Sequence, residues 1–109
     1  MDIDEIRSRL VVKYPAFASI IVNHPFVESV AVNTACTDGN QILYNPGFAA
    51  GLSEDEQLFL LAHEVCHIAF KHIERSKGKD QKIWNIATDA VVNAYLHNDG
   101  LPIIKGGID

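Results

Sequence analysis

Two histidines and a glutamate form the most chemically informative pattern in the 109-residue sequence. His63 and His67 stand four residues apart, and Glu64 directly follows the first histidine. Residues four apart on an α-helix project from one face, so both imidazoles can reach one zinc ion at about 2.0–2.1 Å. Glu64 lies about 100° around the helix, where its carboxylate can take a proton from a metal-bound water. The pattern therefore predicts one catalytic zinc ion.

A catalytic zinc ion needs a third protein ligand and one open coordination position. The predicted third ligand is Asp89, which lies among apolar residues in the middle of a predicted helix. A buried carboxylate there is costly unless it is paired or binds a metal. Asn93 lies one turn later and is predicted to hydrogen-bond a ligand histidine and fix its tautomer. The alternative is that Asp89 points to solvent and Asn93 is merely tolerated.

Two further side chains on the same predicted helix are candidates for stabilising an oxyanion together with zinc. These are Tyr95 and His97, and His97 lies eight residues after Asp89. The alternative for both is a packing or surface role, which tyrosine and histidine often have. The tail that begins at Leu101 is predicted to be a loop, and its terminal Asp109 is a candidate inhibitory ligand of the zinc.

The helices that must hold these groups are predicted from capping residues and hydrophobic periodicity. Ser53 and Glu56 form a capping box, and apolar residues at helical spacing extend the helix behind it to about Arg75. Asp80 is the predicted cap of a last helix that ends near Leu96. The metal ligands would then come from two neighbouring helices.

The N-terminal part is predicted to hold two helices. Asp2 or Asp4 can cap the first, and Pro15 suits the first turn of a second, short helix that ends by residue 22. Asn23-His24-Pro25 then breaks the pattern.

A β-hairpin is predicted next. The Val- and Thr-rich segment 27–35 is followed by Asp38-Gly39, a strong signal for a tight turn because glycine accepts positive φ. Residues 41–44 form the predicted return strand, so the hairpin spans about 30–44.

Composition and charge exclude several classes of function. The net charge is -5, from 14 acidic and 9 basic residues, and no Lys/Arg cluster is dense enough to bind nucleic acid. No apolar run reaches the roughly 18 to 20 residues that a membrane helix needs. The acidic N-terminus lacks the basic start of a secretory signal. Two cysteines, Cys36 and Cys66, predict buried, reduced thiols and a cytoplasmic location.

The metal-site residues resemble a known class of peptidase. His63-Glu64-Val65-Cys66-His67, followed by Trp84-Asn85-Ile86-Ala87-Thr88-Asp89 and Asn93, resembles the gluzincin branch of the zincin metallopeptidases. The chain looks more closely like bacterial metallopeptidase-like domains that precede a von Willebrand factor A-like domain. Thr37-Asp38-Gly39 and Asn45-Pro46 share in that likeness. In size the chain is similar to the minigluzincins, and that likeness adds a latent resting state to the expectations.

The sequence departs from these families in two respects. Gluzincins usually have Glu as the third ligand, and Asp89 has a shorter reach, so the two helices must approach closely. The von Willebrand-like part is absent, so the chain is either a lone minimal peptidase or one domain of a larger protein. In zincins an extended peptide lies antiparallel to an edge strand beside the metal, and the resemblance implies that 30–34 or 42–44 has this role. A structural hairpin that covers the helices is the alternative.

These observations predict one α+β domain over residues 1–109, with N-terminal helices, a small hairpin-based sheet, an active-site helix and a C-terminal ligand helix. The expected function is zinc-dependent hydrolysis of peptide bonds in a peptide or unfolded protein. One alternative is a catalytically idle or latent zinc-binding module, a scaffold or regulatory partner for an ATPase or a von Willebrand-like domain. Another is a helical interaction domain without metal. The intact Glu64 favours the enzyme, because metal binding alone would not need it.

Overall fold

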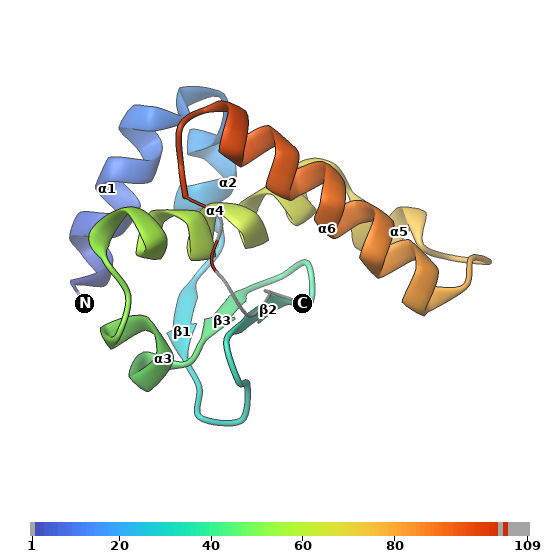
Figure 1. Ribbon diagram of the computed structural model, residues 1–109, viewed down its shortest axis with the longest axis horizontal. Helices are drawn as coiled ribbons and strands as arrows, with labels where there is room; N and C mark the ends of the chain where they lie inside the picture. Colours follow the sequence, from blue (N-terminus) through green and yellow to red (C-terminus); the bar gives the residue numbers. More distant parts are fainter. Residues whose placement is uncertain (1, 103, 105–109) are drawn as a thin grey trace.

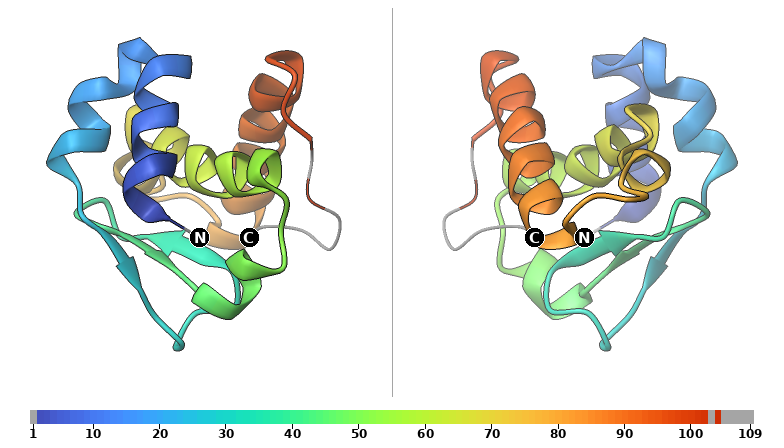
Figure 2. Two further views of the ribbon diagram at one scale, coloured as in Figure 1. Left: turned by 90° about the vertical axis from the view of Figure 1, so that its left-hand side faces the viewer. Right: turned by 90° about the vertical axis from the view of Figure 1, so that its right-hand side faces the viewer.

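The computed structural model describes residues 2–102 and 104, and it has the predicted α+β architecture. Helices surround a central helix that lies across a small three-stranded sheet (Figure 1). Figure 2 shows the sheet below this central helix, with N-terminal helices on one side of it and the last helix on the other. The elements are α1 (Ile3–Lys13), the 3-10 turn η1 (Pro15–Phe17), α2 (Ala18–Asn23), β1 (Phe26–Glu28), β2 (Ala35–Thr37), β3 (Ile42–Tyr44), α3 (Pro46–Ala50), α4 (Glu54–Ala69), α5 (His72–Arg75) and α6 (Gln81–Asn98).

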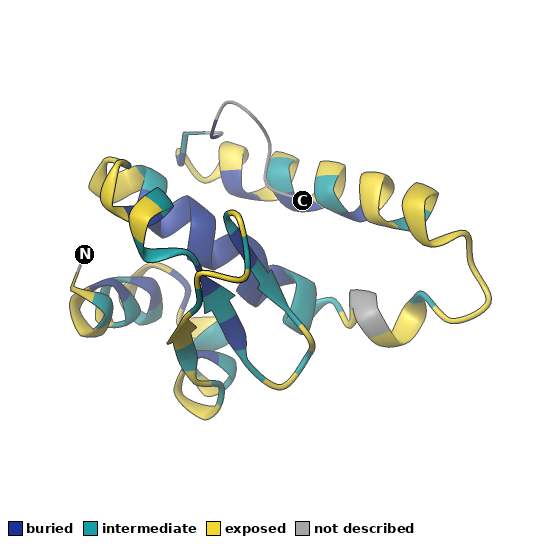
Figure 3. Cartoon of the chain, turned by 90° about the horizontal axis from the view of Figure 1, so that it is seen from below, coloured by how far each residue is buried: buried dark blue, intermediate teal, exposed yellow. Residues whose placement is uncertain are grey.

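Helix α4 forms the centre of the hydrophobic core. It begins at the predicted capping box: Glu56 N donates to Ser53 Oγ (3.2 Å), and Ser53 N donates to Glu56 Oε1 (2.9 Å). Every residue from Gln57 to Cys66 is buried, because α4 contacts α1, α2, α6, β2 and β3. The dark blue segment at the centre of Figure 3 is this helix. Apolar residues on more than one side of a predicted helix thus indicate that other elements cover it on several faces.

The predicted helix to Arg75 is wrong only near its end. Helix α4 ends at Ala69, and Lys71 adopts a left-handed backbone conformation with φ 57°. A lysine in this region interrupts the helix, and the chain resumes in the short helix α5. The sequence carries no glycine or proline at this break, so capping signals could not locate it.

The sheet confirms the predicted hairpin turn but not the first predicted strand. Strands β2 and β3 pair antiparallel, and Gly39 in the connecting turn has φ 93°. Segment 27–35 is not one strand, because β1 ends at Glu28 and residues 30–34 form turns and bends. Strand β1 pairs parallel with β3 on the side opposite to β2, so the chain must cross from one sheet edge to the other between them.

This strand order, β1-β3-β2, corrects the expected substrate-binding segments. Segment 30–34 is not a strand, and β3 is already paired on both sides. Neither can offer a free edge to an extended peptide. The free edges of the described sheet belong to β1 and β2.

The N-terminal helices cover one side of α4. Asp2 caps α1 by accepting hydrogen bonds from Asp4 N and Glu5 N (3.1 and 3.3 Å). Pro15 begins the turn η1 rather than α2 itself, which starts at Ala18. In the described part of the chain, no helix is long and apolar enough to span a membrane.

Helix α6 covers the opposite side of α4. Its predicted cap is confirmed, since Ile83 N donates to Asp80 Oδ1 (3.0 Å). The helix ends at Asn98, two residues beyond the expected end. Its middle and C-terminal parts pack against α4, and this contact positions one face of α6 against the two histidines.

Candidate metal centre

Three atoms from the two central helices form a close triangle. His63 Nε2 lies 3.0 Å from His67 Nε2, and Asp89 Oδ1 lies 3.0 and 2.9 Å from these two nitrogens. The structure therefore brings the three predicted ligands together. Ligand atoms bound to tetrahedral zinc at about 2.0–2.1 Å are about 3.3 Å apart, close to these separations.

Hydrogen bonds alone do not account well for this triangle. A carboxylate oxygen only accepts, so each Nε2 would have to donate its proton to Asp89. No proton would then remain for the contact between the two nitrogens of His63 and His67. A cation satisfies all three atoms at once, because a neutral imidazole nitrogen and a carboxylate oxygen both offer lone pairs. The residues present thus fit a small divalent cation with nitrogen and oxygen ligands.

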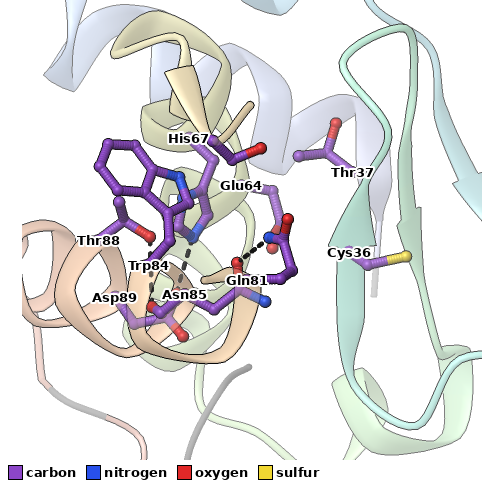
Figure 4. Close-up of a pocket in the computed structure, with 10 residues that line it drawn as sticks. Cys36, Thr37, Glu64, His67, Gln81, Trp84, Asn85, Thr88 and Asp89 are labelled. Atoms are coloured by element: carbon purple, nitrogen blue, oxygen red, sulfur yellow. Dashed lines mark hydrogen bonds and ion pairs between the residues drawn. The ribbon is translucent and has the colours of Figure 1, made fainter. Parts of the chain in front are cut away.

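The core holds the histidine half of this site. His63 is 0% exposed and Glu64 is 1% exposed, because α4 carries them through the core. His67, one turn later, is half-buried and lines a cavity of about 280 Å³. Asp89 reaches the same point from α6, beside the buried Thr88. Figure 4 shows His67 and Asp89 facing each other across this junction.

Glu64 is buried at the same cavity, and no described residue forms a hydrogen bond with its Oε2 atom. It lies with His63 and His67 in a group whose candidate ligand atoms are all within 4.8 Å of one another. Burial raises the pKa of Glu64 to about 8, and the charge of Asp89 adds to that rise. A nearby cation would favour the ionised carboxylate and act in the opposite direction.

Asp89 has the opposite electrostatic character. Burial works to raise its pKa, but hydrogen bonds and charge interactions with His63 and His67 outweigh burial and lower the pKa to about 2. Asp89 is therefore an anion at neutral pH, as a metal ligand must be.

The side-chain carbonyl oxygen of Asn93 does not form the predicted hydrogen bond with a ligand histidine. Among the described residues, neither the buried Asn93 Oδ1 nor the buried His63 Nδ1 has a hydrogen-bond partner. A ligand histidine usually donates its second N–H to such an acceptor. The described structure therefore leaves the outer nitrogen of His63 unpaired.

Tyr95 and His97 do not line the cavity, so each takes the packing or surface role that the sequence left open. Tyr95 lies about 240° around α6 from Asp89 and packs instead in an aromatic cluster, 5.7 Å from the ring of Phe70 and 6.4 Å from that of Tyr14. His97 lies about 12 Å along the helix from Asp89 and is exposed to solvent.

Several cavity residues were not singled out as functional from the sequence. They come from β2 and from the segment between α5 and the middle of α6: Cys36, Thr37, Ser76, Gln81, Trp84, Asn85 and Thr88. The β2 residues could not be found locally, because they reach the cavity only through packing of the sheet on α4. Gln81 and Asn85 carried a signal, since they precede Asp89 by two turns and one turn.

The fold and the site together define a class: small α+β domains in which a His-Glu-x-x-His helix and a carboxylate from a second helix form a candidate metal centre. The chain belongs to the family described as "Putative metallopeptidase domain", whose model matches residues 2–107. This membership and the cluster of His63, Glu64 and His67 agree on a metallopeptidase-like domain.

One relative was identified among curated proteins. An uncharacterized protein of Thermotoga maritima is 33% identical over 70 residues, which make up 62% of this chain. The chain spans 18% of the length of that protein. No solved structure matches the chain.

Proposed function

We propose that this chain is a zinc-dependent metallopeptidase domain of the gluzincin type that hydrolyses peptide bonds in peptides or unfolded proteins. The observation that carries the proposal is the triangle of His63, His67 and Asp89 beside the unpartnered, cavity-lining carboxyl of Glu64. Binding alone would not require a buried acid without a partner at this point. We further propose that residues 1–109 act as one domain.

Each of these side chains has a distinct role. His63 Nε2, His67 Nε2 and Asp89 Oδ1 would hold one zinc ion, leaving one coordination position open. When bound, zinc supplies Lewis acidity that makes water a better nucleophile and polarises the peptide carbonyl. Glu64 takes a proton from the attacking water at its carboxylate and returns it to the leaving amine nitrogen. The raised pKa of metal-free Glu64 would fall beside the zinc charge, which leaves the carboxylate ionised and able to accept the first proton.

The sheet edge nearest the site supports an extended substrate. Cys36 and Thr37 of β2 line the cavity opposite Glu64, and β2 is an edge strand (Figure 4). An extended peptide can add to such an edge through main-chain hydrogen bonds, which would place its backbone across the cavity. Strand β2 thus takes the place of the two segments that the sequence suggested.

Metal content and proteolysis test the proposal together. Purified protein should contain close to one zinc per chain, and Glu64→Gln should retain zinc but lose cleavage of an unfolded protein such as casein. His97→Ala is the matched control: it removes an exposed histidine of α6 and should keep both properties. Zinc-loaded protein that never cleaves an unfolded substrate would overturn the peptidase and leave an idle zinc-binding module.

A further inference from the structure

A row of polar side chains on α6 leads into the metal centre. Gln81, Asn85 and Asp89 are spaced four residues apart, so they share one face of the helix, and all three line the cavity. Asp89 belongs to the metal triangle. The two amides have no part in the roles assigned above, although they line the cavity on the α6 side, with Cys36 and Thr37 of β2 across from them (Figure 4).

The two amides are ordered relative to each other. Gln81 Nε2 donates a hydrogen bond to Asn85 Oδ1 at 2.7 Å, which occupies the carbonyl oxygen of the Asn85 side chain. The Nδ2 group of Asn85 consequently presents two N–H donors, and it has no acceptor within the described residues. Asn85 is exposed, so water satisfies these donors until a ligand displaces it.

We propose that Asn85 Nδ2 binds a backbone carbonyl of the substrate peptide, and that Gln81 is the positioning residue that aims this donor. The proposal rests on the proposed function, because it places the peptide in the same cavity. Strand β2 would pair with one side of the peptide main chain, and Asn85 would contact the main chain from the α6 side.

This arrangement names the substrate class. Main-chain recognition from both walls selects extended, unfolded polypeptide and depends little on the identity of the side chains at the bound position. A neutral amide N–H donates to a peptide carbonyl, whereas an ionised carboxylate at the same position could only accept.

Peptide binding can be measured separately from cleavage. Trp84 is the only tryptophan in the sequence and lines the cavity, so its fluorescence reports cavity occupancy. The probe is an unstructured, tryptophan-free casein peptide, added to the zinc-loaded full chain carrying Glu64→Gln, which prevents turnover. Asn85→Ala should weaken binding about ten-fold, the size expected for one lost hydrogen bond. Zinc content and thermal stability should stay unchanged, because Asn85 is an exposed residue outside the metal triangle.

A second variant tests the positioning role of Gln81. Gln81→Glu preserves shape but replaces the donor with an acceptor, which would turn Asn85 Nδ2 away from the peptide and toward the new carboxylate. We expect a loss of affinity as large as that of Asn85→Ala, whereas Gln81→Ala should cost only a few-fold. The matched control for the added charge is Asn98→Asp at the far end of α6, which should leave binding unchanged.

The outcomes separate this inference from the proposed function. If zinc-loaded wild type cleaves casein while Asn85→Ala and Gln81→Glu bind the peptide as tightly as their parent, the inference is overturned and the peptidase stands. If the peptide binds and depends on Asn85 but wild type never cleaves, the inference stands and the peptidase fails. If the peptide never binds, both are overturned.

Discussion

Helices α4 and α6 meet at the candidate metal centre, yet the protein holds them in very different ways. Ten consecutive residues of α4 are buried, from Gln57 to Cys66. Helix α6 is longer but buries only Thr88, Val92 and Leu96. Apolar side chains of α6 even face solvent, with Ile83 67% and Ile86 62% exposed.

The metal centre therefore has two unlike halves: α4 forms the stiff half, and α6 forms the adjustable half. Close packing allows few alternative positions for His63 and Glu64, because any shift of α4 disturbs the whole core. Asp89 rests on a helix that can shift at low cost, since few of its side chains interlock with neighbours. A metal ion bound by both helices would therefore restrain the position of α6 relative to α4.

The largest expected contrast is in stability. Leu60→Ala removes a side chain that is 0% exposed on α4 and should lower the free energy of unfolding by about 2–5 kcal/mol. Ile86→Ala on α6 removes an exposed side chain and should change it by less than about 0.5 kcal/mol. Urea unfolding of both variants measures the difference. A large loss for Ile86→Ala would mean that a partner or another part of the chain covers α6.

A substitution of a zinc ligand on α4 should weaken zinc binding more than a substitution of the ligand on α6. His67→Ala should weaken zinc binding more than a hundred-fold, because even residues that only support ligands contribute about 10–100-fold. Asp89→Glu should cost less than about ten-fold, since α6 can move to accommodate one extra methylene. Competition with a chelator of known affinity gives both values. An equally large loss for Asp89→Glu would show that α6 is as rigid as α4.

Local signals predicted the helices well because helix starts are encoded by neighbouring residues. The capping box of Ser53 and Glu56 and the cap at Asp80 both form as expected. The end of α4 escaped prediction because the left-handed Lys71 reflects how the chain must turn to bring α6 back, not a local preference. Parallel pairing of β1 with β3 also depends on contacts distant in sequence, so the strand pattern could not indicate it.

Part of the metal centre could also be predicted from local features of the sequence. Helical spacing places His63 and His67 together, and the cost of an unexplained acid in an apolar helix pointed to Asp89. Tyr95 and His97 take the packing and surface roles that the sequence left open as their alternative, because about 240° of rotation and about 12 Å of rise, respectively, separate them from Asp89. Cys36 and Thr37 enter the cavity through tertiary packing alone.

The two carboxyls should respond to pH in opposite directions in metal-free protein. The folded-state pKa of Glu64 on α4 is raised to about 8, so the folded state keeps a proton that the unfolded chain loses above its ordinary pKa of about 4.3. Stability should fall as pH rises through that window, by at most about 1.4 kcal/mol per pH unit from this group. The pKa of Asp89 on α6 is lowered to about 2, so its contribution is present above about pH 3.9 and is lost as pH falls toward 2.

Thermal unfolding in chelator, from pH 2 to 8, separates these contributions. Glu64→Gln should flatten the decline between about pH 4 and 8, and Asp89→Asn should flatten the acid limb. Each variant is compared with wild type at every pH. A Glu64→Gln curve parallel to wild type would show that the acid of α4 is not held protonated by the core.

The smallest effects come from the helix caps, and they test the comparison most directly. Ser53→Ala and Asp80→Ala each remove a side-chain cap, so each should cost about 1 kcal/mol of stability. On α4 the packed core still positions His63, so Ser53→Ala should leave zinc affinity unchanged. On α6 the loss of Asp80 frays the first turns, which lead directly to Asp89, so zinc affinity should fall by up to about five-fold.

Amide hydrogen exchange over residues 81–85 should rise in the metal-free Asp80→Ala variant. It should return toward wild type when zinc is added, because the ion holds the same helix at a position further along. Equal loss of zinc affinity in both cap variants would mean that core packing does not hold α4 in place after its cap is removed. The stiff half and the adjustable half would then no longer differ.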